Sequence, residues 1–292
     1  MFATASSSIY RLDNNIHPKQ TDMNFTIKFL QTLAITAILG GTAVLGVSCS
    51  MVKHKTSAAP NTLTPHESAA GWHLLWDGNT SASWRSARGD YFPTNSWVMH
   101  DGVLTVVATG NAEAQAGGDI ITRECYSNFE FTADFKLTPG CNSGIKIFVQ
   151  PDISPIDRKT GQKTAVGSAI GMEFQILDDE RHPDAKLGRD GDRRLGSLYD
   201  LIPAPANKPV MPLGEWNHVR IVSVGKHVTF WLNGKRTVEF ERGSPAFRTA
   251  VEESKFKNIP EFGEWPNGHI LLQEHGSEVS FRNLKIRELP AN

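Results

Sequence analysis

The residues best suited to chemistry lie on one short apolar stretch, residues 171–178. Glu173 and Gln175 alternate there with a methionine, a phenylalanine and an isoleucine. Because successive side chains of a β-strand point to opposite faces, one face of this strand is apolar and the other carries a carboxylate and an amide. A carboxylate in an apolar strand costs free energy unless it is paired or used. The pattern indicates either a functional surface or the solvent-exposed face of an antiparallel sheet.

Two further stretches repeat this pattern. Residues 145–149 place Lys146 opposite isoleucines, and residues 270–275 place Gln273 and His275 opposite an isoleucine and a leucine. If all three apolar faces point into one core, the polar side chains share the outer surface of one sheet. A lysine, a carboxylate, a histidine and amides suit sugar hydroxyls and can supply a general acid and a general base. The alternative is a solvated sheet face with lysine–glutamate pairs between strands.

Two residues fit this surface less well. The same alternation puts Phe148 on the outer face beside Lys146. Glu274, between Gln273 and His275, falls on the core-facing side of its predicted strand, where a carboxylate costs free energy. A β-bulge in that strand would instead turn Glu274 into the groove.

The loop that follows residue 178 adds further titratable groups. His182 comes shortly after Asp178 and Asp179, whose charges are expected to raise its pKa and tune it for an acid–base role. The same three residues are an alternative ligand set for a divalent metal ion, although their spacing matches no strong metal motif. Tyr199 is expected either to form another wall of the groove or to pack in the core.

Short β-strands must position these groups. Two residue pairs typical of hairpin turns, Asp101-Gly102 and Asn233-Gly234, separate apolar runs. Only residues 244–260 have a pattern that fits a short helix, so the chain is predicted to be all-β, a sandwich or jelly roll of two antiparallel sheets. The strands are predicted at residues 97–100, 103–107, 119–122, 129–137, 144–150, 171–178, 216–223, 227–232, 236–240, 269–275 and 278–287.

The N-terminal part of the chain has a different composition. Residues 1–22 are polar and without pattern, and they are interpreted as a non-native or disordered extension. Residues 23–49 have a positive charge, an apolar run, small residues and then Cys49, which is typical of a lipoprotein signal with an acylated cysteine. A cleaved soluble signal and a retained single-span anchor are the alternatives, and all three predict export. Residues 50–70 are expected to be a flexible linker and residues 71–290 a single domain.

Composition excludes several classes of protein. The net charge of −1 gives no electrostatic argument for binding nucleic acid or an anionic membrane surface. The sequence contains no GxSxG, HExxH, P-loop or GxGxxG motif. Trp84 and Trp265 lie in loop-like sequence and are candidate platforms for sugar rings, whereas the other tryptophans are expected to pack.

The two cysteines of the domain are predicted to be free. Cys125 and Cys141 flank the predicted strand at residues 129–137, which is about 30 Å long at roughly 3.3 Å per residue. A disulfide needs Cα atoms within about 7 Å of each other, so this strand keeps them apart.

Several motifs follow one another along the domain. They include Trp72-His73-Leu74-Leu75-Trp76-Asp77-Gly78, Asn142-Ser143-Gly144-Ile145-Lys146, Glu173-Phe174-Gln175-Ile176-Leu177-Asp178, Gly196-Ser197-Leu198-Tyr199-Asp200, Trp231-Leu232-Asn233-Gly234 and Leu272-Gln273-Glu274-His275-Gly276. Together they resemble the 3-keto-disaccharide hydrolase domain family, and the resemblance covers nearly all of residues 71–289. Phe148 and Cys141 depart from the family pattern, and Phe148 stands where many relatives carry Tyr or Arg.

The resemblance implies a concanavalin A-like jelly roll that acts on 3-keto-glycosides. It also implies export in a Gram-negative bacterium, with Cys49 anchoring a periplasmic or outer-membrane lipoprotein. A carbonyl at C3 acidifies the C2 proton, so a base can remove that proton and the glycosidic oxygen at C1 can leave by elimination, with or without later addition of water. No cofactor is required for such a step, and a metal near Asp178 is left open.

Roles can be assigned as a hypothesis. Glu173 or His182 is the base and Lys146 stabilises the enolate oxygen. Two other classes remain as alternatives: a non-catalytic, lectin-like carbohydrate-binding domain and a conventional glucanase. The glucanase ranks last, because the strand at residues 171–178 carries Glu173 and Gln175 on its polar face rather than a pair of carboxylates. The residues expected to bind the oligosaccharide or glycoside are Gln175, Asp178, Tyr199, Gln273 and His275.

Overall fold

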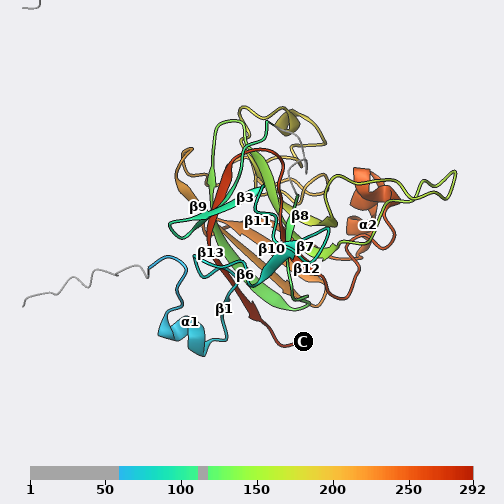
Figure 1. Cartoon of the computed structure of the whole chain (residues 1–292). Helices are drawn as coiled ribbons and strands as arrows, with labels where there is room; N and C mark the ends of the chain where they lie inside the picture. Colours follow the sequence, from blue (N-terminus) through green and yellow to red (C-terminus); the bar gives the residue numbers. More distant parts are fainter. Residues whose placement is uncertain (1–58, 111–117, 292) are drawn as a thin grey trace, which may run out of the picture. The chain divides into compact units, whose positions relative to one another are not determined.

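Residues 59–110 and 118–291 are described by the computed structural model, and they form two antiparallel β-sheets with few helices (Figure 1). The elements in chain order are α1 (Pro65–Ala69), β1 (His73–Leu74), β2 (Trp84–Ser86), β3 (Trp97–His100), β4 (Val103–Val106), β5 (Ile120–Thr122), β6 (Phe129–Leu137), β7 (Asn142–Gln150), β8 (Ile170–Leu177), η1 (Pro183–Lys186), β9 (Trp216–Val224), β10 (His227–Leu232), β11 (Lys235–Glu241), α2 (Pro245–Glu252), η2 (Lys255–Asn258), β12 (His269–Leu272) and β13 (Val279–Glu288).

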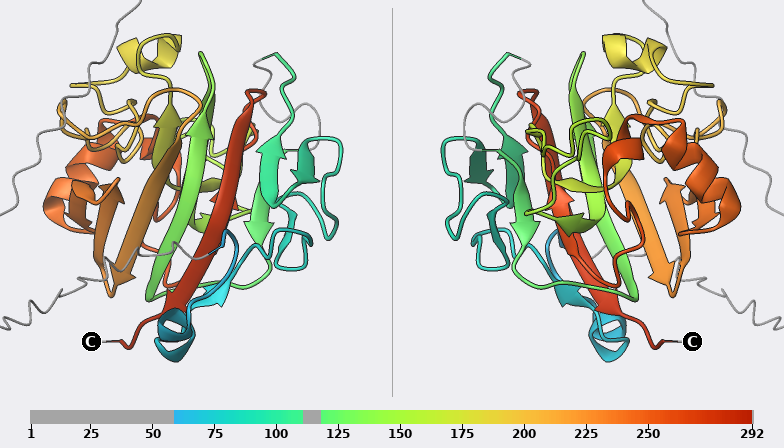
Figure 2. Two further views of the ribbon diagram at one scale, coloured as in Figure 1. Left: turned by 90° about the vertical axis from the view of Figure 1, so that its left-hand side faces the viewer. Right: turned by 90° about the vertical axis from the view of Figure 1, so that its right-hand side faces the viewer.

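The strands are divided unequally between the two sheets. The larger sheet has the order β11-β10-β9-β6-β13-β4-β3, with β1 paired to β13, and the smaller has the order β2-β5-β12-β7-β8. Figure 2 shows the long strands β6 and β13, in green and red, side by side in the larger sheet. The predicted all-β jelly-roll sandwich is therefore confirmed, and β12, β7 and β8 are neighbours as the proposed polar surface requires.

Apolar side chains from the two sheets meet in one core. Phe174 of β8 lies with its ring centroid 6.3 Å from Phe135 of β6 and 5.6 Å from Phe230 of β10, both in edge-to-face contact. Such aromatic pairs add to the free energy gained by burying the rings. The isoleucines of β7 are buried in the same core, so the alternation in β7 and β8 points the polar residues outward as predicted.

The end of β7 breaks the alternation. A register shift lies between Ile147 and Gln150, and Phe148 there has a positive φ of 53°. This bulge turns Phe148 into the core, where the Arg242 guanidinium lies 3.8 Å from its ring centroid. The prediction that Phe148 shares the outer face with Lys146 is therefore wrong, because Phe148 packs in the core.

The folded part of the chain begins earlier than predicted. Residues 59–70, expected to be a linker, include α1, which starts with a capping box between Thr64 and Glu67. Asn61 is 7% exposed; its Nδ2 donates to the carbonyl of Gly102 (2.7 Å) and its Oδ1 accepts from the Asn283 amide (2.8 Å). These bonds tie the segment to the sandwich, and they could not be read from its composition.

Other predictions for the N-terminal part lie outside the described residues. These are the extension at 1–22, the signal segment at 23–49 with Cys49, and the first residues of the linker. Within residues 59–110 and 118–291, none of the helices is long and apolar enough to cross a bilayer.

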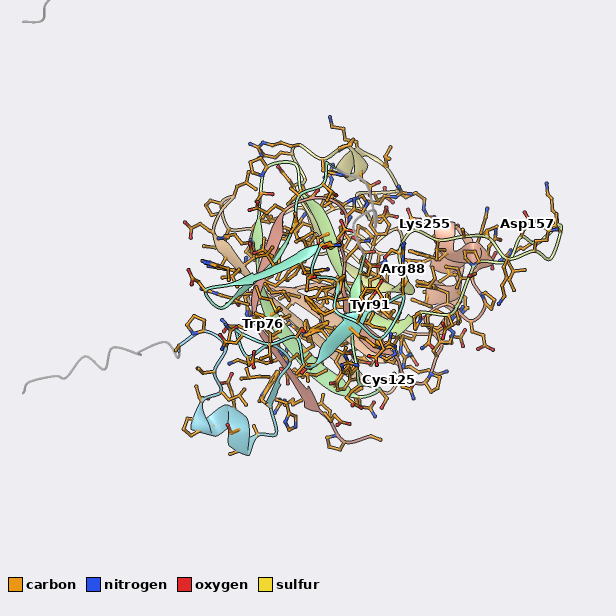
Figure 3. All side chains as sticks on the ribbon, viewed as in Figure 1. Trp76, Arg88, Tyr91, Cys125, Asp157 and Lys255 are labelled. Atoms are coloured by element: carbon orange, nitrogen blue, oxygen red, sulfur yellow. The ribbon has the colours of Figure 1, made fainter. Side chains whose placement is uncertain are left out.

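The predictions that the two cysteines are free and that residues 244–260 contain a short helix are both confirmed. Cys125, exposed at the surface (Figure 3), and Cys141, buried, are free. The segment 244–260 contains α2 and η2.

Asn61→Ala should lower the free energy of unfolding by about 2–4 kcal/mol, because it removes the side-chain hydrogen bonds to the Gly102 carbonyl and the Asn283 amide and places alanine at a positive φ. Chemical denaturation of the full chain measures the change. His66→Ala, at an exposed position of the same segment, is the control and should change the free energy by less than about 0.5 kcal/mol. A wild-type unfolding curve for Asn61→Ala would show that the segment does not stabilise the domain.

Candidate active site

A pocket of about 540 Å³ opens on the outer face of β12-β7-β8. Its floor comes from the sheet, and its walls come from residues 155–170, 182–187 and 255–259. Lys255, labelled in Figure 3, lies in the segment after α2 and is one of the residues that line the pocket. The predicted site residues that line the pocket are Lys146, Glu173, Gln175, His182, Tyr199, Gln273 and His275.

An ion pair lies at the floor of the pocket. Antiparallel pairing of β7 with β8 places Lys146 opposite Glu173, and Lys146 Nζ lies 3.9 Å from Glu173 Oε2. Each residue is 6% exposed. Burial raises the pKa of Glu173, and the charges of Lys146 and Lys255 oppose that shift. A carboxylate with a raised pKa is a better proton acceptor than an exposed one.

A glycine makes room for the carboxylate. The side chain of Glu173 lies over Gly144 of β7, and a Cβ at that position would be 2.1 Å from Glu173 Oε1. Any larger residue would therefore push the carboxylate away from its present place.

Lys146 is held from its other side by a buried chain of polar groups. Its Nζ donates to Ser168 Oγ and to the carbonyl of Ala169 (3.2 Å), and the Ser168 hydroxyl donates to Asp119. Asp119 also accepts from the Ala169 amide (3.2 Å) and the Glu274 amide (3.0 Å). Burial raises the pKa of Asp119, and Lys146 opposes the shift. Sequence reasoning missed Asp119, which directly precedes β5, because the short apolar run after it gives no sign of a functional carboxylate.

The last predicted strand is shorter than expected. β12 ends at Leu272, so the alternation that places Gln273 and His275 in the groove stops applying there. Both residues still line the pocket, because hydrogen bonds hold the chain beyond β12 against β7: the Gln273 amide donates to the Gly144 carbonyl (2.9 Å) and the Gln273 carbonyl accepts from the Ser143 hydroxyl (2.9 Å). Glu274 is buried away from the pocket, where its Oε1 accepts from the Gly276 amide (2.9 Å).

His182 differs from its prediction. Its pKa is lowered, because burial and the neighbouring His275 outweigh the charges of Asp184 and Asp178. The prediction of a raised pKa was wrong, since His275 comes from a distant part of the chain; the two rings are 6.3 Å apart and nearly perpendicular. His182 Nδ1 accepts from the Asp184 amide (3.2 Å), so the neutral ring carries its proton on Nε2. His182 is thereby suited to donate a hydrogen bond rather than to accept a proton.

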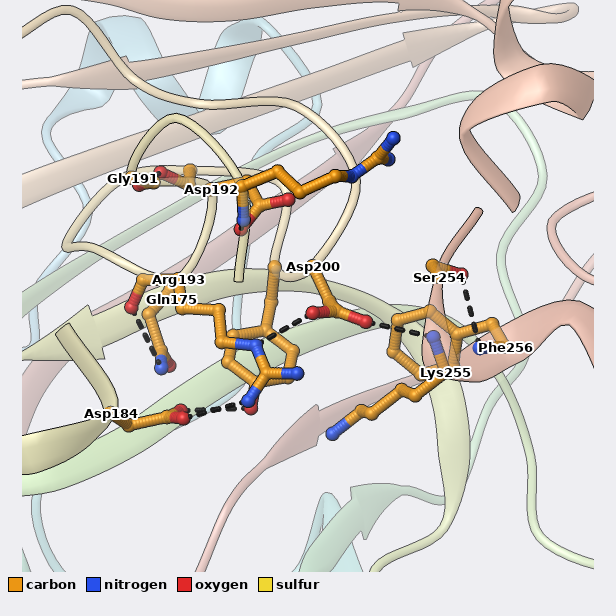
Figure 4. Close-up of polar contacts among 12 residues, drawn as sticks. Gln175, Asp184, Gly191, Asp192, Arg193, Asp200, Ser254, Lys255 and Phe256 are labelled. Atoms are coloured by element: carbon orange, nitrogen blue, oxygen red, sulfur yellow. Dashed lines mark hydrogen bonds and ion pairs between the residues drawn. The ribbon is translucent and has the colours of Figure 1, made fainter. Parts of the chain in front are cut away.

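A network around Arg193 fixes one wall of the pocket (Figure 4). Arg193 donates from Nη1 to Asp184 (2.9 Å) and from Nε to Asp200 (2.6 Å). Tyr199 donates its hydroxyl proton to the other oxygen of Asp184 (2.8 Å). The other oxygen of Asp200 accepts from the backbone amide of Lys255 (2.8 Å), so this network joins two of the walls. Lys255 was missed by sequence reasoning, because its segment has no periodic pattern.

Asp178 does not line the pocket. It accepts from the Gly140 amide (2.8 Å) and from Arg181, and these partners lower its pKa although burial opposes them. Asp179 accepts from the Leu195 amide (2.7 Å) and pairs with Lys208. No group of three or more His, Cys, Asp or Glu residues in the described part of the chain could hold a metal ion. The predicted contact between Asp178 and substrate stays a prediction, and Asp178 lies outside the residues that line the pocket.

The two tryptophans proposed as sugar platforms are buried. Trp84 is fully buried and donates from Nε1 to the carbonyl of Leu75 (2.6 Å), and Trp265 packs against Phe262 in the core. Neither lines the pocket, whose apolar surface comes instead from residues such as Phe256 and Ile259.

Residues 71–287 match the family model of the 3-keto-alpha-glucoside-1,2-lyase-like domain. The chain belongs to this family. A relative from Bacteroides thetaiotaomicron, named 3-keto-disaccharide hydrolase, is 31% identical over 260 residues, which cover 83% of this chain and 87% of that protein. The resemblance seen in the sequence motifs is thus confirmed.

Two solved structures of proteins from Parabacteroides distasonis ATCC 8503, each named a putative glycosyl hydrolase, are similar to this chain. One is 28% identical with a TM-score of 0.64 and covers 80% of this chain and 100% of its own; the other is 29% identical with a TM-score of 0.54 and covers 75% and 99%. Both likenesses support the jelly-roll fold described above.

The imidazole of His182 is expected to be neutral at pH 7, protonated on Nε2, and to titrate below the ordinary value of about 6.5. Nitrogen-detected NMR of the full chain through a pH series measures both properties, with the signal assigned by its loss in His182→Gln. A midpoint above the ordinary value, or a proton on Nδ1, would contradict this assignment.

Proposed function

We propose that the protein cleaves the glycosidic bond of 3-keto-glycosides by elimination, followed or not by addition of water. The observation that carries the proposal is the Glu173–Lys146 pair, buried at the floor of an open pocket. Membership of the family and the name of the Bacteroides relative support the same substrate class.

Glu173 is the base in this proposal. Its carboxylate takes the C2 proton, which the neighbouring C3 carbonyl has made acidic, and the electron pair moves into an enolate. His182 was the alternative base, but its Nδ1 lone pair is used by the Asp184 amide and its pKa is lowered. Lys146 stabilises the developing charge on the C3 oxygen.

Polar side chains around the pair orient the sugar. Gln175, Gln273, His275 and the Nε2 proton of His182 offer donors and acceptors for hydroxyl groups. Gln273 Oε1 and His275 Nδ1 are buried without a hydrogen-bond partner among the described residues, which costs free energy that a bound polar group would offset.

The arrangement fits a conventional glycosidase less well. Such an enzyme uses two carboxylates on either side of the bond that breaks. Asp184 is the other carboxylate of the pocket lining, and both of its oxygens are already bound by Arg193 and Tyr199. Glu173 therefore has no free carboxylate partner among the described lining residues.

We also propose that residues 23–49 export the protein and that acylation of Cys49 anchors it to a membrane of a Gram-negative cell envelope. The motif in the sequence supports this, and metabolic labelling with a fatty acid tests it. Label that is lost in Cys49→Ala is the expected result, and equal labelling of both proteins would contradict it.

Incubation of the full chain with a 3-keto-glucoside and with its unoxidised parent tests the proposed reaction. Cleavage of the keto form alone is expected, because only the carbonyl acidifies C2. Cleavage of both forms would indicate a conventional glycosidase, and binding without cleavage a lectin-like protein.

Glu173→Gln and Lys146→Ala should each lower kcat/KM on the keto substrate by roughly 10²–10⁴-fold. In the wild type, kcat/KM should fall as the pH drops through the raised pKa of Glu173, since the base must be ionised. Near-wild-type turnover in both variants would contradict these roles.

Gly144→Ala should lower activity nearly as much as Glu173→Gln, because the new Cβ would displace the Glu173 carboxylate. Adding Gly144→Ala to Glu173→Gln should cause little further loss, since both changes disable the same group. Additive losses in the double variant would show that Gly144 acts through some other contact.

A further inference from the structure

Lys255 is a charged residue of the pocket lining whose ammonium group has few contacts with other protein groups. Its side chain is exposed toward the pocket, and its ammonium lies 4.2 Å from the ring centroid of Tyr199. Within the described part of the chain, this ammonium makes no hydrogen bond or ion pair. Its N–H donors are therefore free to meet a ligand.

Lys146 differs in this respect. Its donors are directed to Ser168, to the carbonyl of Ala169 and toward Glu173. Releasing a proton would remove the positive charge that holds these buried partners, which is costly in a buried ion pair. The two lysines of the pocket are thus suited to different tasks.

The backbone of Lys255 is firmly placed. Its amide donates to Asp200, which Arg193 joins to Asp184 (Figure 4). Ser254 begins η2 by accepting from the Phe256 amide (3.0 Å). The backbone of Lys255 is therefore fixed, whereas its long side chain is flexible. This combination suits an ammonium group that must reach the leaving oxygen of a substrate.

The charge of Lys255 is coupled to that of Glu173. Exclusion of solvent by the surrounding protein lowers the pKa of Lys255, Glu173 opposes this, and Lys146 adds to the lowering. The charge of Lys255 in turn lowers the pKa of Glu173. A lysine below its usual pKa gives up a proton more readily at neutral pH.

We propose that Lys255 is the catalytic acid that protonates the leaving glycosidic oxygen. This rests on the proposed function. Glu173 takes the C2 proton to form the enolate; the C3 carbonyl then re-forms, a C1–C2 double bond forms and the C1–O bond breaks. The leaving oxygen keeps the bonding electrons and takes a proton from the Lys255 ammonium. Transfer of the proton from Glu173 to the neutral amine resets both groups, so the proton lost from C2 balances the proton gained by the released alcohol.

Other acids of the pocket are less suitable. The hydroxyl proton of Tyr199 is already donated to Asp184, and burial raises the pKa of Tyr199. His182 is neutral near pH 7 because its pKa is lowered, so it has little imidazolium to offer. The proton on the leaving oxygen therefore comes best from Lys255.

The test compares leaving groups in Lys255→Met. A 4-nitrophenoxide leaves without much help from an acid, whereas a methoxide needs a proton. Lys255→Met should lower kcat/KM by roughly 10²–10⁴-fold on methyl 3-keto-glucoside but by less than about 10-fold on the 4-nitrophenyl compound. Lys257→Met, at an exposed lysine of the same helix η2, should leave both rates unchanged.

A second readout separates proton abstraction from departure. In D₂O, Lys255→Met should still exchange the C2 proton of methyl 3-keto-glucoside for deuterium, because Glu173 still forms the enolate and the blocked elimination returns it. Lys255→Arg should not restore methyl glucoside cleavage, since a guanidinium keeps the charge but is too weak an acid.

Three results would overturn the proposal. Equal losses on both substrates, loss of C2 exchange, or full rescue by Lys255→Arg would show that Lys255 only binds or positions the sugar. Failure of the proposed function itself would look different, because the wild type would then neither cleave nor exchange either keto substrate. That result would remove the role of Lys255 together with the reaction.

Discussion

The pairing of Lys146 with Glu173 on adjacent strands is the constraint on which the site depends. Removing a charge from water costs several kcal/mol, and an unpaired partner left behind destabilises a fold by about 3–5 kcal/mol. The register of β7 and β8 sets the two charges opposite each other. Because β7 is the middle strand of β12-β7-β8, both neighbours can add polar groups around this pair.

Other polar groups of the pocket lower the free-energy cost of burying Lys146 and Glu173. On one side, Ser168 from the loop before β8 accepts from Lys146 and donates to Asp119, which directly precedes β5. On the other, Arg193 forms ion pairs with both Asp184 and Asp200, so that each carboxylate of the wall next to Glu173 has a cationic partner. A rigid sheet thus holds the pair, while long loops close the walls; such a division is common in enzymes, whose working loops rest on a stable scaffold.

Sequence periodicity predicted the sheet and most of its polar face. The strand Phe129–Leu137 has the predicted bounds, and the alternation around Glu173 and Lys146 points them outward as expected. The errors arose where backbone geometry or distant residues decide the outcome. A bulge turned Phe148 into the core, and His275 changed the electrostatics of His182.

The remaining omissions have the same physical origin. Lys255 lies in an irregular segment where no period identifies an inward face, and its position depends on a hydrogen bond to Asp200. The segment around Asn61 looks like a linker by composition, yet side-chain bonds to residues 41 and 222 positions away fold it onto the sandwich. Contacts of such separation leave no local signature in one sequence.

The balance of charge in the pocket bears on the kind of reaction it favours. Conventional glycoside hydrolysis passes through an oxocarbenium-like transition state, and carboxylates stabilise its positive charge. Here Glu173 faces two ammonium groups, Lys146 and Lys255, and Asp184 is paired with Arg193. In the reaction proposed above, these two ammonium groups stabilise negative charge on an enolate oxygen or a departing alkoxide. The proposed elimination therefore fits the charges next to Glu173 better than a path that builds positive charge at C1.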